Sequence, residues 1–357
     1  MFMLMTLEKF WQKFASFLWP FGKAYSLLMQ TRHVAYAKGV LKSHQVPAKV
    51  ISVGNLSLGG EGKTPLVIWL ARFFETQGVK AAIVTRGYRG RLKGPIIVGD
   101  QGKVFYPSKD IGDEAVLLSL KTEVPVIVAR DRVAGARLAI QKRGVQVVIL
   151  DDGFQHLPLK RDLDLVLMSP GRDPFKEKVF PAGYLRESWP ALNRAHAFII
   201  TKSKPEDQKA QKLVEKLKCF AKPIFYAPFN LKNPYKLEDL WQRGKKPIQT
   251  KQEKVIAFCG LARPEPFFKA ASHFFSLAQK VAFEDHVYYD QAQIDYLLAQ
   301  KEKYSATGFV TTEKDAVKLK KFVQELEPCY LLPIEAKPEE GLGDFILKHL
   351  ENNGTPC

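Results

Sequence analysis

The feature that most constrains this chain is the glycine-rich segment at residues 50–65, VISVGNLSLGGEGKTP. A β-branched run enters a glycine-rich turn, and the turn ends in Gly62, Lys63 and Thr64 before a helical pattern begins. In a phosphate-binding loop of this order, backbone N–H groups close around phosphate oxygens, the lysine adds positive charge and the hydroxyl ligates Mg²⁺. The segment therefore predicts a nucleotide phosphate site.

The loop departs from the strict G-x-x-x-x-G-K-[ST] pattern at one position. Ser57 stands where the first glycine would fall, although the later glycines keep the turn flexible. We assign phosphate binding to Gly59, Gly60, Gly62, Lys63 and Thr64. The competing interpretation is a glycine-rich connection that carries a surface lysine, but the preceding strand and the following helix favour the phosphate site.

Short apolar runs alternate with helical patterns after this loop. Predicted strands lie at residues 81–85, 124–128, 145–150, 163–168, 195–201 and 223–227. Strands without polar alternation are typical of a parallel sheet covered on both faces. We therefore predict an α/β fold, a P-loop NTPase-like, doubly wound and mostly parallel sheet within residues 31–235.

A second, smaller α/β domain is predicted within residues 236–357. The chain turns polar and basic over about residues 230–253, which we interpret as a connection. The alternation then resumes, with strands at 255–259, 279–283 and 308–312 and helices around 266–277 and from residue 290.

Residues 1–30 predict an amphipathic helix with an unusually aromatic stripe. The stripe comprises Leu7, Phe10, Trp11, Phe14, Phe17, Leu18 and Phe21. No uncharged run reaches the roughly 18 residues of a spanning helix, and no signal-peptide cleavage site follows. Glu8 is the only acid before Lys49, so we predict a helix in an anionic membrane interface. The alternative is a helix packed on its own domain.

The formal net charge of +17 indicates an anionic partner. Nucleic acid, an anionic membrane and a phosphorylated substrate all fit, and charge alone does not choose between them. The four cysteines are Cys219, Cys259, Cys329 and Cys357. They are far apart and form no C-x-x-C pair, so the sequence indicates a reducing compartment and neither a zinc site nor a disulfide framework.

Carboxylates stand at positions where an α/β sheet places its ligands. Asp151 and Asp152 follow a predicted strand, where a Walker B acid would hold Mg²⁺ opposite Thr64. The alternative is that they only begin a turn. Asp113 and Glu114 open a helical pattern, where acids often do no more than complement the helix dipole.

Three further segments allow either a functional or a structural interpretation. Arg86 and Arg89 follow a predicted strand and could reach phosphates or belong to a solvated turn. His286 follows another strand, and a single histidine is more often structural than catalytic. The charged residues of 312–318 could simply decorate the surface.

Taken together, seven segments in this order resemble the tetraacyldisaccharide 4'-kinase family. They are residues 53–65, 85–90, 112–114, 151–156, 181–187, 283–286 and 312–317. The resemblance runs from the N-terminal helix nearly to the C-terminus, and the family is similar in lacking the first loop glycine. Glu61 departs from it, because the family often has a small residue there, and Val287 stands where a second histidine is common.

The resemblance implies a membrane-associated enzyme that transfers the γ-phosphate of ATP to the 4'-hydroxyl of a tetraacylated glucosamine disaccharide 1-phosphate. This reaction is a late step of lipid A synthesis. It implies Asp113 as the base for the acceptor hydroxyl, His286 as its partner and Glu187 as a residue associated with Mg²⁺. Phosphoryl transfer needs charge neutralisation, for which we expect Lys63, Thr64 and Asp151 or Asp152, with ATP and Mg²⁺ as cofactors.

The expected partners follow from this substrate. They are the lipid disaccharide 1-phosphate and an anionic membrane surface, with no nucleic acid, and we expect a monomer. The expected location is the cytoplasmic face of the inner membrane, with peripheral or monotopic attachment.

Two rival functions remain at this point. A membrane-associated P-loop ATPase switch would hydrolyse ATP without phosphorylating an acceptor, and would need no Asp–His pair reaching across two domains. A nucleic-acid-binding ATPase would use the positive charge, but the usual sequence signatures of such modules do not occur.

Overall fold

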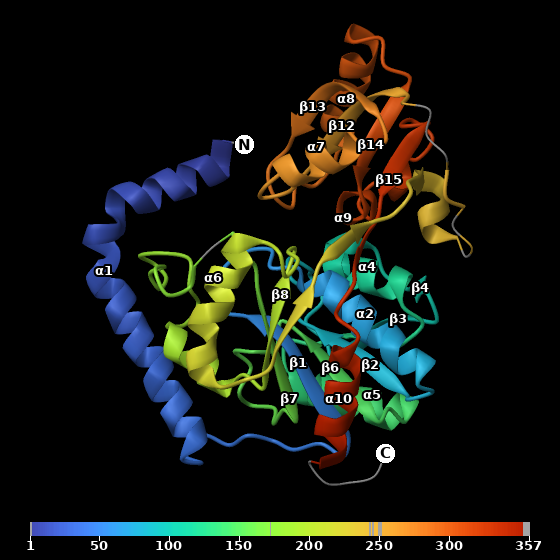
Figure 1. Ribbon diagram of the computed structural model, residues 1–357. Coiled ribbons are helices and arrows are strands. Elements are labelled where there is room, and N and C mark those ends of the chain that lie inside the picture. Colours follow the sequence, from blue (N-terminus) through green and yellow to red (C-terminus); the bar gives the residue numbers. More distant parts are fainter. Residues whose placement is uncertain (1, 172, 243, 245, 249–251, 353–357) are drawn as a thin grey trace.

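The computed structural model describes residues 2–171, 173–242, 244, 246–248 and 252–352, and the side chains from residue 14 onward. The stripe positions Leu7, Phe10 and Trp11 and the thiol of Cys357 lie outside the described side chains. Two large sheets, one above the other in Figure 1, and a small two-stranded sheet organise the described chain.

The larger sheet has nine strands in the order β4-β3-β5-β2-β6-β1-β7-β8-β9. They are β1 (Lys49–Asn55), β2 (Ala81–Thr85), β3 (Ile96–Asp100), β4 (Lys103–Val104), β5 (Val126–Val128), β6 (Val147–Asp151), β7 (Leu163–Met168), β8 (Ala197–Thr201) and β9 (Ile224–Ala227). The antiparallel pairs of this sheet are β3 with β4 and β3 with β5, at one edge. The predicted doubly wound, mostly parallel sheet is confirmed, and its carboxyl ends gather the candidate site residues.

Helices cover both faces of this sheet, which is why its strands are apolar throughout. One face carries α2 (Lys63–Thr76), α4 (Asp113–Lys121) and α10 (Gly341–Asn352), which pack in one core with strand residues such as Ile51 and Leu165. The other face carries α5 (Arg132–Arg143) and α6 (Gln208–Leu217), in two separate cores. The short α3 (Ser108–Ile111) precedes α4.

The smaller sheet has five strands in the order β11-β15-β14-β12-β13. They are β11 (Tyr235–Lys236), β12 (Lys254–Cys259), β13 (Ser276–Ala282), β14 (Gly308–Thr312) and β15 (Cys329–Leu332), with helices α7 (Glu265–Ala271), α8 (Gln291–Lys303) and α9 (Glu313–Ala316). The predicted helix at 266–277 was too long, because β13 already begins at Ser276. Apolar residues there fit both helical and strand spacing, which periodicity alone cannot separate.

The chain crosses between the sheets twice, and the crossings pair with each other. β10 (Phe229–Leu231) and β16 (Ile334–Ala336) form an antiparallel two-stranded sheet. The predicted connection at 230–253 therefore contains regular structure, including β11 and the 3-10 helix η3 (Leu237–Trp241). After the second crossing α10 returns to the large sheet, where His349 Nε2 lies 3.0 Å from the carbonyl oxygen of Asp162. The C-terminal helix thus packs with the first unit, although it follows the second in sequence.

Helix α1 (Phe2–Ala37) wraps around the side of the large sheet (Figure 1). It continues through Pro20 and docks where Gly22 allows close approach, since a Cβ there would lie 2.9 Å from the carbonyl oxygen of Val179. Further along, the rings of Tyr25 and Phe180 meet edge to face. Within the described part of the chain, no helix is both long enough and apolar enough to cross a bilayer.

Candidate active site

The phosphate loop joins β1 to α2 through a turn that only glycine can make. Gly62 caps α2 with φ +88°, and a Cβ at this position would lie 2.2 Å from the ring of Phe229. The left-handed backbone and the close ring each exclude a side chain. Lys63 and Thr64 are the first two residues of the helix, so their side chains and backbone N–H groups stand at its N-terminal end.

Polar side chains within the loop hold its shape. Lys63 Nζ donates to Asn55 Oδ1 at 3.0 Å, and Asn55 Nδ2 donates to the carbonyl oxygen of Ser57 at 2.9 Å. Ser57 Oγ in turn donates to Glu61 Oε1 at 2.7 Å. Ser57 therefore has a structural partner at the position where the strict motif has glycine, and Glu61 is buried.

The segment 181–187 lies along the phosphate loop. The N–H of Leu58 donates to the carbonyl oxygen of Tyr184 at 2.6 Å, and the N–H of Arg186 donates to the carbonyl oxygen of Leu56 at 2.8 Å. These backbone contacts give the irregular segment a structural role beside the phosphate loop. It braces the loop from outside.

Asp151 ends β6 and Asp152 follows it, beside the loop lysine. The buried Asp151 accepts a hydrogen bond from Thr85 Oγ1 at 2.8 Å. Asp152 lies 3.3 Å from Lys63 Nζ, and Arg186 Nη1 donates to both of its oxygens at 2.8 Å. The structure brings the predicted Walker B acids and Lys63 together.

The two aspartates have opposite electrostatic environments. Burial, together with the charges of Glu114 and Asp152, raises the pKa of Asp151 to about 7. Burial also acts on Asp152, but the positive charges of Lys63 and Arg186 outweigh it and lower its pKa to about 2. Asp152 is therefore ionised at neutral pH, whereas the charge of Asp151 depends on whether another cation compensates it.

The donor set fits Mg²⁺. A threonine hydroxyl and two carboxylates are hard oxygen donors. Burial and the nearby negative charges raise the pKa of Asp151, and a divalent cation at this position would offset both effects. The described residues include no group of three or more His, Cys, Asp or Glu side chains arranged for a metal ion. Mg²⁺ commonly takes only one or two carboxylates and completes its shell with phosphates and water.

Glu187 is engaged elsewhere in this structure. Its Oε2 accepts a hydrogen bond from Arg194 Nη2 at 2.7 Å, and Glu187 is buried while Arg194 is mostly buried. Arg194 ends the 3-10 helix η1 (Trp189–Arg194) and stacks over Phe154. An association of Glu187 with Mg²⁺ stays a prediction.

Asp113 and His286 meet across the two sheets although 173 positions separate them. Asp113 begins α4 after Gly112, whose φ is +87°. His286 lies in the turn that follows β13 and has a φ of +60°. Asp113 Oδ2 is 3.4 Å from His286 Nδ1, and both side chains are mostly buried.

The 85–90 turn supports this contact. Arg89 Nη1 donates to the carbonyl oxygens of His286 at 3.2 Å and Asp285 at 3.3 Å. The ring of Tyr88 packs edge to face against the His286 imidazole. Arg89 therefore binds the backbone of the smaller domain, a role that neither interpretation of this turn had included.

Sequence reasoning missed Lys318 and Asp315. The interpretation of 312–318 as surface decoration was wrong, because Asp315 is fully buried and only 1% of the Lys318 side chain is exposed. Lys318 Nζ lies 3.0 Å from Asp315 Oδ1 and 3.8 Å from Asp113 Oδ2. The signal was available in the Asp–Lys spacing of three directly after a strand end, which places both charges on one side of a helical turn.

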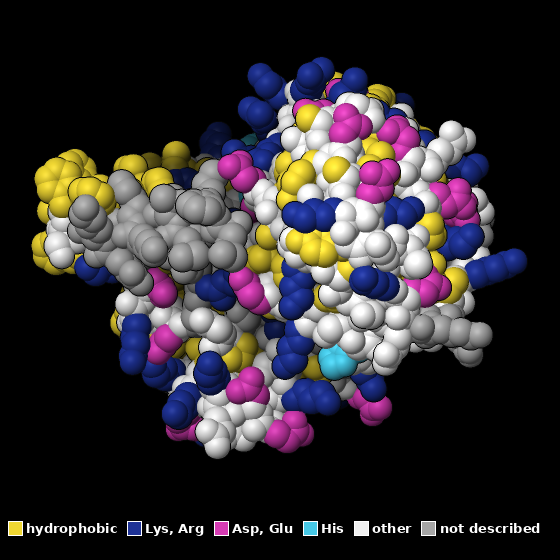
Figure 2. All heavy atoms as spheres, turned by 90° about the horizontal axis from the view of Figure 1, so that it is seen from above, with side chains coloured by type: hydrophobic (Ala, Val, Ile, Leu, Met, Phe, Trp, Pro, Cys, Tyr) yellow, Lys and Arg dark blue, Asp and Glu magenta, His cyan; other side chains and the backbone are white. Residues whose placement is uncertain are grey.

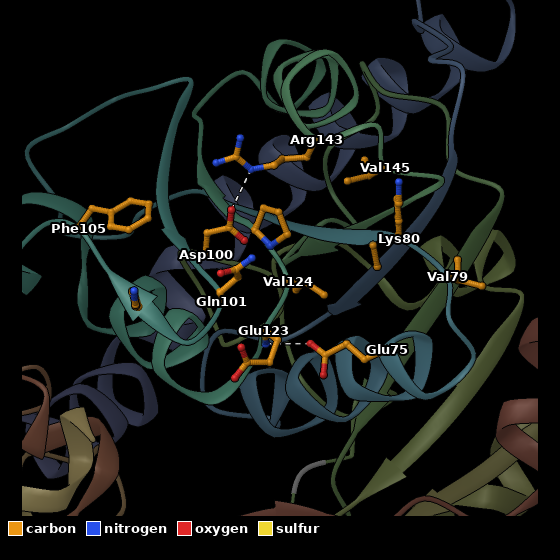
Figure 3. Close-up of a pocket in the computed structure, with 13 residues that line it drawn as sticks. Glu75, Val79, Lys80, Asp100, Gln101, Phe105, Glu123, Val124, Arg143 and Val145 are labelled. Atoms are coloured by element: carbon orange, nitrogen blue, oxygen red, sulfur yellow. Dashed lines mark hydrogen bonds and ion pairs between the residues drawn. The ribbon is translucent and has the colours of Figure 1, made fainter. Parts of the chain in front are cut away.

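A surface pocket lies at the opposite end of the strands. Its lining includes Lys80 and Val145, which precede β2 and β6, and Val124, which precedes β5 (Figure 3). An ion pair of 2.8 Å between Arg143 and Asp100 crosses it. Parallel strands place their carboxyl ends at the other edge, so this pocket is separate from the phosphate loop.

His156 should make the stability of the protein depend on pH. Burial, aided by the charge of Arg132, lowers the pKa of His156 to about 4. Between an unfolded value near 6.5 and this folded value, the unfolded chain binds more protons, so stability falls as the pH drops. The Tm of His156→Gln should therefore fall less than that of the parent between pH 7 and pH 4.5. The control is His273→Gln, which replaces an exposed histidine and should follow the parent. If the Tm of His156→Gln and that of the parent fall equally with pH, burial of His156 is not the cause.

Comparisons with known proteins agree with this geometry. A family model described as tetraacyldisaccharide-1-P 4'-kinase (LpxK) matches residues 14–351. The tetraacyldisaccharide 4'-kinase of Desulfotalea psychrophila is 37% identical over 338 residues, covering 92% of this chain and 95% of the relative. The relative of the same name from Syntrophotalea carbinolica is also 37% identical and covers 91% of this chain and 88% of its own.

A solved structure extends the likeness to three dimensions. The crystal structure of LpxK from Aquifex aeolicus in complex with ATP superposes with a TM-score of 0.77 at 30% identity. The match covers 94% of this chain and 99% of that one.

Proposed function

The chain belongs to the tetraacyldisaccharide-1-P 4'-kinase family, and from this premise we propose how its site works and where the protein acts. It is an ATP-dependent kinase of lipid A biosynthesis that phosphorylates the 4'-hydroxyl of a tetraacyldisaccharide 1-phosphate. The observation that supports the site assignment most strongly is the contact of Asp113 with His286 at the sheet edge that carries the phosphate loop.

The phosphate loop and the β6 acids would hold the nucleotide. Lys63 and the N-terminal end of α2 would bind phosphate oxygens, and Thr64 with Asp151 or Asp152 would hold Mg²⁺. When bound, Mg²⁺ neutralises charge on the β- and γ-phosphates. Arg186 keeps Asp152 in place, because it binds both carboxylate oxygens.

The acceptor is an unactivated sugar hydroxyl that must lose its proton. Asp113 would take this proton as the oxygen forms its bond to the γ-phosphorus, while the bond from that phosphorus to the β–γ bridging oxygen breaks and ADP leaves. His286 would orient the carboxylate. Neither residue is assigned to the triphosphate.

Helix α1 would bring the enzyme to the cytoplasmic face of the inner membrane. Phe17 and Phe21 of the predicted stripe are 73% and 58% exposed. Figure 2 shows hydrophobic side chains along the left edge of the molecule, where α1 lies in Figure 1. Acyl chains could then remain in the bilayer while the sugar reaches a basic site.

Deletion of residues 1–21 should release much of the protein from membranes. The cut falls just before Gly22, which packs closely on the 179–182 segment, so this contact is retained. We would measure sedimentation with anionic vesicles, and Phe17→Ser with Phe21→Ser serves as a matched variant without truncation. If both proteins sediment as the parent does, α1 is not the membrane anchor.

A transfer assay tests the function directly. We would supply ATP labelled at the γ-phosphate and tetraacyldisaccharide 1-phosphate in mixed micelles, and we expect a labelled bisphosphorylated lipid. Chelation of divalent cations should stop the reaction, and added Mg²⁺ should restore it. Lipid-stimulated release of inorganic phosphate without a labelled lipid would favour an ATPase switch instead.

A further inference from the structure

The two contacts of the Asp113 carboxylate fall on the same oxygen. His286 Nδ1 lies 3.4 Å from Oδ2, and Lys318 Nζ lies 3.8 Å from Oδ2. His286 and Lys318 therefore both approach this carboxylate at Oδ2, and 13% of the Asp113 side chain is exposed.

The far nitrogen of the His286 ring is also engaged. Lys314 Nζ lies 3.2 Å from His286 Nε2. An ammonium group can only donate, so a hydrogen bond from Lys314 requires the lone pair on Nε2 and the proton on Nδ1. Asp285 Oδ1 also faces Nε2, but at 4.0 Å it lies beyond hydrogen-bond distance. In that tautomer Nδ1 donates to Asp113 Oδ2.

Lys318 is held far more rigidly than a surface lysine. Its ammonium is buried against Asp315, and Asp315 also accepts hydrogen bonds from Tyr289 at 3.1 Å and Thr312 at 2.6 Å. The Tyr289 ring lies under the ammonium, 5.2 Å from it. Burying an ammonium group is costly unless it is paired, and Asp315 meets that need by itself. The second carboxylate within reach, Asp113, belongs to the other domain.

We propose that Lys318 is a positioning residue for phosphoryl transfer, which holds Oδ2 of Asp113 together with His286 so that Oδ1 receives the acceptor proton. Lys314 contributes by fixing the tautomer of His286. This inference rests on the proposed role of Asp113 as the base. One consequence is that the base is correctly held only while the smaller domain contacts α4.

The contact at the other end of α4 fits this arrangement. Lys121, the last residue of α4, forms a buried ion pair of 2.5 Å with Glu313, which also accepts a hydrogen bond from Tyr235. Both ends of α4 therefore contact residues 313–318, Asp113 through Lys318 and Lys121 through Glu313. The smaller domain thereby fixes the helix that carries Asp113.

Lys318→Met should lower kcat by about 10-fold or more and change the KM for ATP by less than about 3-fold. Because this variant leaves Asp315 without its cation, the double variant Lys318→Met with Asp315→Asn removes both buried charges. If Lys318 only neutralised Asp315, the double variant would recover the parent kcat, and that recovery would overturn the proposal. We expect the double variant to stay as slow as Lys318→Met and Asp315→Asn alone to keep most of the rate.

Two further variants separate this inference from the role of Asp113. Lys320→Met removes an exposed charge two positions along and should leave the rate unchanged. In an Asp113→Asn background, Lys318→Met should cost less than about 3-fold, since the two act as a unit. Near-normal transfer by Asp113→Asn would refute the base itself. If Asp113→Asn is slow but Lys318→Met with Asp315→Asn transfers at the parent rate, only the role of Lys318 is refuted.

Discussion

Replacing Lys63 with alanine is expected to lower kcat for phosphoryl transfer by about 10²- to 10³-fold, the usual cost of removing one preorganised charge contact. Its ammonium stands at the first position of α2, 3.0 Å from Asn55 and 3.3 Å from Asp152. It makes polar contacts rather than core packing. Arg186 continues to bind Asp152 in the variant, so the fold should persist.

The measurement is the transfer rate of Lys63→Ala beside its Tm and circular dichroism. Lys209→Ala, an exposed lysine of α6, is the matched control and should transfer at the parent rate. Near-normal turnover by a folded Lys63→Ala would remove the phosphate loop from the mechanism.

Asp113→Ala should lower kcat by about 10²- to 10⁴-fold, the range that a positioned general base supplies. Asp113 is the first residue of α4, at the edge of the large sheet where the parallel strands end. Its carboxylate contacts the imidazole of His286 from the other domain. In the variant, Lys318 retains its ion pair with Asp315, so the loss should not come from unfolding.

ATP affinity should stay nearly unchanged in Asp113→Ala, because the nucleotide is assigned to Lys63, Thr64 and the β6 acids. Nucleotide binding would be measured by titration calorimetry on the same preparation that is used for kinetics. A large loss of ATP binding would instead place Asp113 in the nucleotide site.

The phosphate loop and the β6 acids could be predicted because parallel strands impose their geometry. A glycine-rich turn between β1 and α2 and two acids after β6 must meet, since the carboxyl ends of neighbouring strands lie at one edge. Local spacing carried that information, and Lys63 indeed lies beside Asp152.

The contacts made by the smaller domain were harder to predict. Which turn of one sheet faces the other depends on the β10–β16 crossing, and hydrophobic periodicity does not record it. Arg89 and Lys318 were therefore interpreted as surface charges or phosphate ligands, although they bind across the boundary. Only the family resemblance paired Asp113 with His286.

The central claim is that one catalytic centre is assembled from both domains, and a double-mutant cycle tests it most directly. Transfer rates would be measured for Asp113→Ala, His286→Ala and the double variant. Residues that act as a unit lose their effects non-additively, so the double variant should be little slower than the worse single variant. If the two defects multiply instead, Asp113 and His286 act independently and the assembled centre is contradicted.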